Sequence, residues 1–169
     1  MLTPQRASFA PDVKSSCILV PVKGVAGEEE VLRLAFTLAG PPGDRRSKQR
    51  TQIEVIHVIE VPQALALDAE MPDAIQAGEQ ALARAEQLAA QREITIEAEM
   101  LQARSAGIAI VDEAIERGAD LIIMGAVYRS QHGEFNLGGT LPYVFKNAPC
   151  RVLVMRSPKP EGEEKRGKG

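Results

Sequence analysis

The sequence predicts an α/β fold: a doubly wound, five-stranded parallel sheet with the strand order 3-2-1-4-5. Short apolar runs alternate with longer segments of helical period, which is typical of a parallel sheet covered by helices on both faces. Right-handed crossovers leave few arrangements of such units. The third strand, Glu93–Gln102, alternates apolar and polar residues and therefore belongs at an edge. The two most apolar strands, the first and the fourth, then lie inside the sheet.

The amino-acid composition limits the classes of protein to which this chain can belong. The chain has 169 residues, of which 44% are hydrophobic and 25% charged, so we expect one domain with a substantial core. That domain spans 16–156, between a flexible arm at 1–15 and a disordered tail at 157–169 that is rich in Lys, Glu, Pro and Gly. A net charge of −3 gives no reason to expect nucleic acid as a partner. With no apolar run near the roughly 18 residues of a membrane span and no secretory signal, we expect a cytoplasmic protein without direct membrane insertion.

The first half of the chain predicts two strands and two helices. Cys17–Val22 is a continuous apolar run, typical of a strand buried on both faces. A helix over 28–39 begins with three glutamates at its positive end and ends at Gly40. The β-branched segment Thr51–Val61 is the second strand, and an amphipathic helix over 72–92 follows it. The side chains expected to pack on the sheet are Val31, Leu34, Ala35 and Leu38 from the first helix and Ile75, Gly78, Leu82, Ala85 and Ala89 from the second.

The second half predicts three more strands and two more helices. After the edge strand a helix ends at Gly118, and the apolar run Leu121–Met124 indicates a central strand. A loop over 127–137 leads into the last helix, which Pro149 ends, and Val152–Met155 is the fifth strand. The expected packing stripes are Ile108, Val111, Ala114 and Ile115 in the third helix and Leu141, Val144, Phe145 and Ala148 in the fourth.

Residues that often carry chemistry have structural interpretations here. Cys17 and Cys150 begin strands separated by another strand, roughly 10 Å apart, so we expect two small buried hydrophobes and no disulfide. His57 lies in a buried strand and is interpreted as a packed core histidine, and His132 as a solvated loop residue. The sequence has no Cys/His cluster with metal spacing, no nucleophile elbow and no Walker motif. We therefore predict no catalytic residue, no metal site and no enzyme activity.

A ligand site is predicted where the sheet reverses its winding direction. In an open α/β sheet, ligands bind outside the carboxyl ends of the strands at that point, which here lies between strands one and four. A glycine-punctuated segment follows strand four, with Gly125, Gly138 and Gly139 ahead of the last helix. Free backbone N–H groups and a helix N-terminus suit an anion, most often a phosphate. The alternative is that these glycines merely supply turns with positive φ.

These segments resemble the signature of the universal stress protein family. The resemblance rests on Met124-Gly125, Gly139-Thr140 and the run over 147–154, with weaker similarity in the first, second and fourth strands. It covers roughly 17–156 and implies a five-stranded, adenine nucleotide alpha hydrolase-like fold with the strand order given above. The resemblance also implies a homodimer. Some members of the family bind ATP or another adenine nucleotide, and others do not.

The chain departs from the pattern of the nucleotide-binding members, which is Gly, two residues, Gly, nine residues, then Gly and Ser or Thr. Gly125 matches the first position, but Tyr128 stands at the second, where a side chain would fill space that a phosphate needs. Gly139-Thr140 matches the end with a loop one residue longer. Lys23 stands where binding members often carry an acid, and Pro142 removes one N–H from the last helix.

The resemblance assigns roles to particular residues. Gly125, Gly139 and Thr140 would cradle phosphates, and Val22 and Val58 would line an adenine pocket. Lys23 and Arg129 would add positive charge. The predicted nucleotide-binding residues are Pro21, Val22, Lys23, Val58, Met124, Gly125, Arg129, Gly138, Gly139, Thr140 and Leu141. The cofactor would be ATP or another adenine nucleotide, and the sequence gives no indication for or against Mg²⁺.

The leading hypothesis is a sensor or regulator whose partners change with ligand occupancy at the loop after strand four. The alternative is an interaction module that binds no nucleotide and regulates a protein partner such as a membrane transporter, and a third interpretation is a slow ATPase. The last strand has no polar alternation although it lies at an edge, and an exposed apolar edge strand is a liability. We therefore expect a homodimer through Arg151–Arg156, unless the tail or the last helix covers that edge.

Overall fold

The computed structural model describes residues 15–41, 50–126, 129–131 and 134–156. The expectations for the arm before Ser15 and for the tail at 157–169 lie outside the described residues, as do those for Tyr128 and His132.

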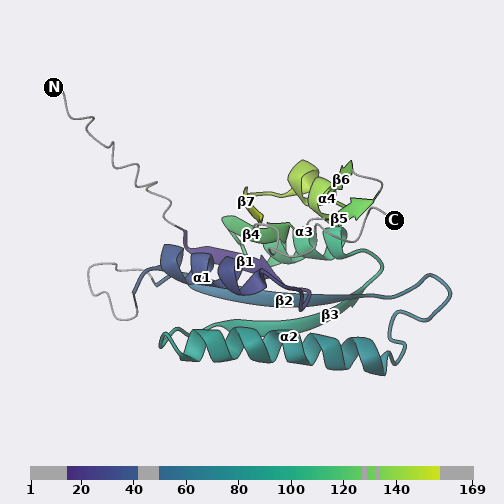
Figure 1. Ribbon diagram of the computed structural model, residues 1–169, viewed down its shortest axis with the longest axis horizontal. Helices are drawn as coiled ribbons and strands as arrows, with labels where there is room; N and C mark the ends of the chain where they lie inside the picture. The colour runs from purple at the N-terminus through teal and green to yellow at the C-terminus, as the bar shows by residue number, and fades with distance from the viewer. Residues whose placement is uncertain (1–14, 42–49, 127–128, 132–133, 157–169) are drawn as a thin grey trace, which may run out of the picture.

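Five parallel strands form the sheet in the order β3-β2-β1-β4-β7 (Figure 1), which confirms the predicted order with β7 as the fifth strand. β1 and β4 are internal and pair with each other through Ile18 and Leu121. β3 and β7 are the outermost strands of the sheet. The strands are β1 Cys17–Pro21, β2 Gln52–Glu60, β3 Glu97–Ala103, β4 Leu121–Ala126 and β7 Arg151–Arg156.

Helices cover both faces of the sheet (Figure 1). α1 (Glu28–Ala39) and α2 (Pro72–Ala90) bury their apolar faces against one side, in a core cluster that includes Ile18, Val20 and Phe36. α3 (Ala106–Glu116) and α4 (Thr140–Asn147) cover the other side, over a cluster that includes Leu19 and Ile122. Successive residues of β1, β4 and β7 alternate between the two clusters, as the pleat requires.

Two of the predicted packing stripes are partly wrong. Ile108 and Ile115 of α3 are 45% and 62% exposed, and Phe145 of α4 is 54% exposed. α3 instead buries mostly small residues, because it packs closely on α4: a Cβ on Gly107 would lie 3.1 Å from the side chain of Tyr143. α3 carries apolar residues around most of its circumference, so periodicity alone could not choose its inner face. The residues that α3 buries are Ala106, Gly107, Ile110, Val111 and Ala114.

The other two helices show smaller shifts. α1 buries Leu32 and Phe36 more fully than Leu34 and Leu38, which are half-buried. α2 buries Gly78, Ala85 and Ala89 as predicted, together with Ala81. The predicted faces of α1 and α2 are therefore correct to within about one residue of rotation.

The segments after α2 and after β4 differ from the sequence-based expectation. β3 begins at Glu97 rather than Glu93, because Glu93 takes a positive φ of 55° in the turn after α2. The segment expected to be a loop after strand four contains a short antiparallel hairpin of β5 (Arg129–Gln131) and β6 (Glu134–Asn136). Three-residue strands carry too little periodicity to be found in a sequence.

The cysteines and the described histidine have structural roles. Cys17 is buried as predicted, but Cys150 is half-buried rather than buried, and both thiols are free. Burial raises the pKa of Cys17 to about 11 and also raises the pKa of Cys150, so neither is an activated thiolate. His57 is a packed core residue, as predicted. It is 8% exposed, its Nδ1–H donates to the Val22 carbonyl at 3.0 Å, and its ring fills the space beside Gly78.

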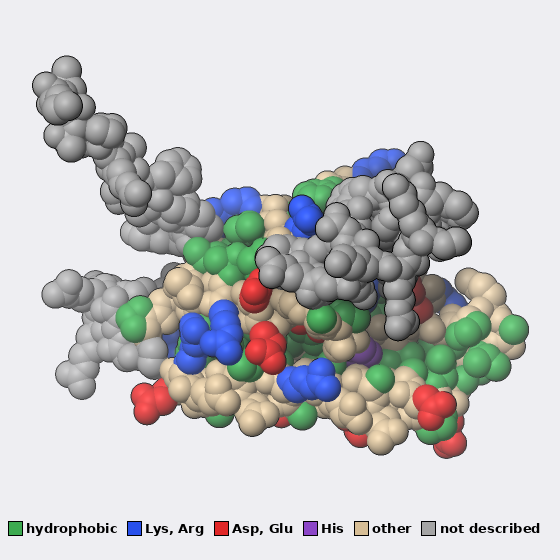
Figure 2. Space-filling view, viewed as in Figure 1, with side chains coloured by type: hydrophobic (Ala, Val, Ile, Leu, Met, Phe, Trp, Pro, Cys, Tyr) green, Lys and Arg blue, Asp and Glu red, His purple; other side chains and the backbone are tan. Residues whose placement is uncertain are grey.

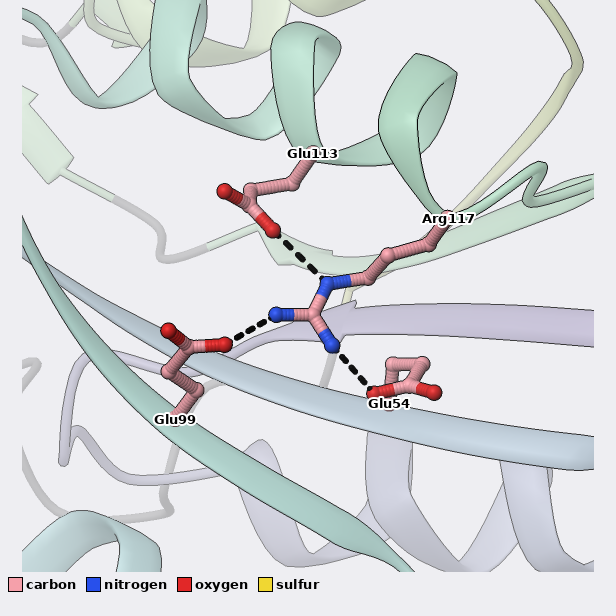
Figure 3. Close-up of polar contacts among 4 residues, drawn as sticks. All are labelled: Glu54, Glu99, Glu113 and Arg117. Carbon is pink, nitrogen blue, oxygen red and sulfur yellow. Dashed lines mark hydrogen bonds and ion pairs between the residues drawn. The ribbon is translucent and has the colours of Figure 1, made fainter.

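Ion pairs between charged side chains stabilise the amino-terminal edge of the sheet, which is the edge where the strands begin. Arg117, which follows α3, binds three carboxylates at once: Glu54 of β2 at 2.6 Å, Glu113 of α3 at 2.7 Å, and Glu99 of β3 (Figure 3). Burial raises the pKa of Glu54, and Arg117 opposes that shift. Burial disfavours the charged form of Arg117, but its hydrogen bonds to Glu113 and Glu99 outweigh this and raise its pKa. This Arg117 cluster therefore ties α3 to two strands.

A second contact closes the same edge next to β4. The Asp120 carboxylate accepts hydrogen bonds from the Ser16 N–H at 2.7 Å, the Ser16 hydroxyl at 2.8 Å and the Cys17 N–H at 3.4 Å. Desolvation acts to raise the pKa of Asp120, but the hydrogen bonds from Ser16 and Cys17 lower it below its usual range. Asp120 therefore positions the start of β1 beside the start of β4.

Candidate functional site

A cavity of about 280 Å³ lies at the opposite, carboxyl-terminal edge of the sheet, where β1 and β4 end. Its walls come from the end of β1, the loop between β1 and α1, the end of β4, and the first residues of α4. Glu60 at the end of β2 and Met155 of β7 complete the lining. The cavity therefore occupies the winding reversal where the sequence analysis expects a ligand.

Most of the predicted binding residues line this cavity. Val22 does not, because its side chain is 3% exposed in the core under α1 and α2, and Val58 packs instead toward α3 and α4. The backbone of Arg129 lies in β5, and its side chain is outside the described part of the chain. The predicted residues that line the cavity are Pro21, Lys23, Met124, Gly125, Gly138, Gly139, Thr140 and Leu141.

The three glycines of the site are there for different reasons. Gly138 has a φ of +68°, which favours glycine in a turn. Gly125 packs closely, since a Cβ would lie 3.2 Å from Cγ2 of Val31, which would have to move by a few tenths of an ångström. Gly139 has ordinary helical angles and, among the described residues, no atom within 4 Å of the position a Cβ would take. Neither a positive φ nor a contact with a described atom explains Gly139, which lines the cavity without a side chain.

Helix α4 begins in the cavity wall, at Thr140, with Gly139 as its N-cap residue and no side-chain cap. The first N–H groups of a helix have no partner within the helix, and the helix dipole places partial positive charge there. Pro142 lacks one of these N–H groups. The remaining backbone donors at Gly139, Thr140 and Leu141 make this wall of the cavity suited to an anion.

The loop between β1 and α1 is organised by Glu28, which the sequence analysis treated as a helix-dipole residue only. Its carboxylate accepts hydrogen bonds from the backbone N–H groups of Lys23 at 2.5 Å, Gly24 at 2.7 Å and Val25 at 3.1 Å. These three donors already hold a carboxylate and are not available to a ligand anion. Lys23 is the one Lys or Arg among the described residues that line the cavity, so its ammonium group supplies their positive charge.

Glu60 is the second acidic residue of the cavity that the sequence analysis missed. It is the last residue of β2, and its Oε1 accepts the Ala106 N–H at 2.8 Å, at the start of α3. The available signal was an acid at the carboxyl end of a buried strand, next to the expected ligand site. Glu28 at the start of α1 and Glu60 at the end of β2 therefore add two carboxylates to the lining of the cavity.

Other site types find no support in the part of the chain that the structure describes. Among those residues, no group of three His, Cys, Asp or Glu side chains is arranged to hold a metal ion. No helix there has the length and apolarity to cross a bilayer. On the face that Figure 2 shows, Lys and Arg side chains are interspersed with Asp and Glu and form no continuous basic surface.

Comparison with known proteins identifies the relatives of this chain. The universal stress protein family matches residues 16–156. A universal stress protein of Methanocaldococcus jannaschii is 29% identical over 150 residues, which are 85% of this chain and 84% of the relative.

Solved structures agree on the fold. The universal stress protein of Archaeoglobus fulgidus in complex with dAMP has a TM-score of 0.61 and 22% identity, and the match covers 81% of this chain and 94% of that one. A universal stress protein family protein of Arabidopsis thaliana with AMP bound has a TM-score of 0.55 and 14% identity, covering 89% of this chain and 97% of that one. The chain is a member of the universal stress protein family and has its adenine nucleotide alpha hydrolase-like fold.

Proposed function

We propose that this protein binds an adenine nucleotide in the cavity at the carboxyl edge of its sheet and acts as a regulatory module. The observation that carries the proposal is the position of Gly139 and the N-terminus of α4 in the wall of that cavity. Two universal stress proteins with the same fold have been seen with dAMP and with AMP. The nucleotide phosphates would lie against α4, and Lys23, which follows β1, would add positive charge to the cavity.

The size of the cavity favours a small nucleotide. Its volume of about 280 Å³ is just below the range of roughly 300–1,000 Å³ for small-molecule sites. Pro142 leaves one N–H fewer for a phosphate, and three further N–H groups are taken by Glu28. We therefore expect AMP or another nucleotide with few phosphates to bind at least as tightly as ATP.

The regulatory part of the proposal rests on β7. Among the described residues β7 is hydrogen-bonded to β4 and to no other strand, and its apolar run Val152–Met155 is half-buried. We propose that this edge pairs with a second copy of the chain across a two-fold axis. Because Met155 lies both in β7 and in the cavity wall, a bound nucleotide would contact the strand that forms the dimer.

Calorimetry on freshly purified protein, with AMP, ADP, ATP and cyclic AMP, tests the binding. We expect binding by the wild-type protein and a loss of at least about ten-fold in affinity for Gly139→Ala, which adds a methyl group to a residue that lines the cavity. Thr140→Ala should weaken binding less, because it removes a hydroxyl but no backbone donor. Undiminished binding in both variants would refute the position of the site, and no binding up to millimolar nucleotide would favour the non-nucleotide interaction module.

Light scattering after gel filtration at micromolar concentration tests the assembly, with and without AMP. A dimer supports pairing through β7, and a monomer in both conditions contradicts it.

An assay for phosphate release from ATP tests the third interpretation. Release that is lost in Gly139→Ala would indicate an ATPase rather than a binding module.

A further inference from the structure

We propose that Glu60 accepts a hydrogen bond from a ribose hydroxyl and makes the site selective for ribonucleotides over deoxyribonucleotides. The inference rests on the proposed nucleotide binding and adds a specificity-determining residue to it. Glu60 lines the same cavity as Gly139 and Thr140. After β1 this chain carries Lys23, whose ammonium group cannot accept a hydrogen bond, so Glu60 would supply the acceptor for the sugar.

A hydrogen bond positions the carboxylate of Glu60 and leaves part of its acceptor capacity available. Its Oε1 accepts the Ala106 N–H at 2.8 Å, which fixes the carboxylate between β2 and α3. Among the described residues, its Oε2 has no hydrogen-bond partner. By contrast, both oxygens of Glu28 already accept backbone N–H groups. Since a carboxylate offers about four acceptor positions, Glu60 keeps more free acceptor capacity in the cavity than Glu28 does.

The order of the strands determines which part of a nucleotide meets Glu60. The α4 N-terminus follows β4, and β1 separates β4 from β2, so phosphates at α4 would lie roughly 10 Å from the end of β2. A carboxylate also repels phosphate and pairs with donors, and the ribose hydroxyls are such donors. In dinucleotide-binding sheets an acid that follows the first nucleotide-binding turn holds a ribose hydroxyl in the same way.

The substitution Glu60→Gln separates the two roles of this residue. The amide oxygen of glutamine can still accept the Ala106 N–H, while its NH₂ group takes the place of Oε2 and can only donate. The variant should therefore fold as the wild type does, with a donor in place of the acceptor Oε2 at a residue that lines the cavity. Glu79→Gln on the exposed surface of α2 removes the same charge away from the cavity and is the matched control.

The experiment is calorimetry of both variants and the wild type with AMP, 2′-deoxy-AMP, 3′-deoxy-AMP and inosine monophosphate. We expect the wild type and Glu79→Gln to bind at least one deoxy analogue about five-fold more weakly than AMP, as for a charged acceptor left without its donor. In Glu60→Gln this ratio should fall below about two-fold.

Other outcomes separate the two proposals. Equal binding of AMP and both deoxy analogues by the wild type, or a ratio unchanged in Glu60→Gln, would overturn the role of Glu60 and leave nucleotide binding intact. An effect of Glu60→Gln confined to inosine monophosphate would assign Glu60 to the base and overturn its role toward the sugar. Failure of the wild type to bind AMP at all would contradict the proposed function itself and remove this inference with it.

Discussion

The amino-terminal edge of the sheet, where its strands begin, and the carboxyl-terminal edge, where they end, are built in opposite ways. At the amino-terminal edge, ionised side chains bind one another and the backbone, through the Arg117 cluster and Asp120. At the carboxyl-terminal edge, glycines and the start of a helix leave backbone donors facing a cavity. Fastening one edge with side chains allows the other edge to keep polar groups for a ligand. Stability and binding should therefore respond to different substitutions.

The largest expected effect is at Arg117. Replacing it by methionine leaves the Glu54 carboxylate, whose side chain is 6% exposed, without its cation, and such a loss costs about 3 kcal/mol or more in the free energy of unfolding. Urea unfolding followed by circular dichroism measures this. Arg33→Met is the matched control, because Arg33 pairs with Glu29 on the surface at 3.7 Å and should cost below about 0.5 kcal/mol. Similar losses in the two variants would show that the Arg117 cluster adds no more than a surface ion pair.

Asp120→Asn should cost about 1 kcal/mol near neutral pH, because an amide cannot accept all the hydrogen bonds from Ser16 and Cys17 that the carboxylate accepts. The pKa of Asp120 is lowered in the folded protein, so its contribution is present above pH 3.8 and is lost as the pH falls further. Unfolding by urea at several pH values should show the wild type and the variant converging in strong acid. A difference that persists there would assign the loss to packing rather than to the charge.

The pH dependence of stability that Glu54 causes should be smaller than that of Asp120 and opposite in sign. Burial raises its pKa above 4.5 in the folded state, so the folded protein holds this proton more tightly than the unfolded chain does. The stability from this group is therefore highest in acid and declines as the pH rises from 4.5 through the raised pKa. Glu54→Gln should remove that decline, so that in urea unfolding the stability of the variant rises relative to that of the wild type as the pH increases above 4.5. Parallel pH profiles would contradict a raised pKa.

The smallest expected change in stability is at the carboxyl edge. Gly139→Ala adds a methyl group in a helical conformation with no described atom within 4 Å, so the free energy of unfolding should change by less than about 0.5 kcal/mol. The same variant is expected to lose nucleotide affinity, whereas Asp120→Asn should keep it. Thermal unfolding and calorimetry on the two proteins test this reciprocal pattern, and a variant that loses both properties would weaken the separation of the edges.

The site was predictable where it depends on backbone and local sequence. Gly125, Gly138 and Gly139-Thr140 follow a buried strand and precede a helix, and the structure gathers them around one cavity. The acids of the site were not predicted. Glu28 reaches back to its own preceding loop, and Glu60 meets the start of α3, which begins at Ala106. The contact of Glu60 with α3 joins segments that are distant in the sequence, so no local sequence pattern predicts it.

The sequence by itself determined the layered α/β architecture and the strand order. The apolar runs of β1 and β4 and the alternation in β3 each have a direct cause in burial on two faces or one. Tertiary structure decided which face of α3 turns inward, because close packing on α4 selects small residues such as Gly107 over the larger Ile108 and Ile115. Arg117 is already four residues from Glu113 along the chain, but only the folded chain brings Glu54 and Glu99 within its reach.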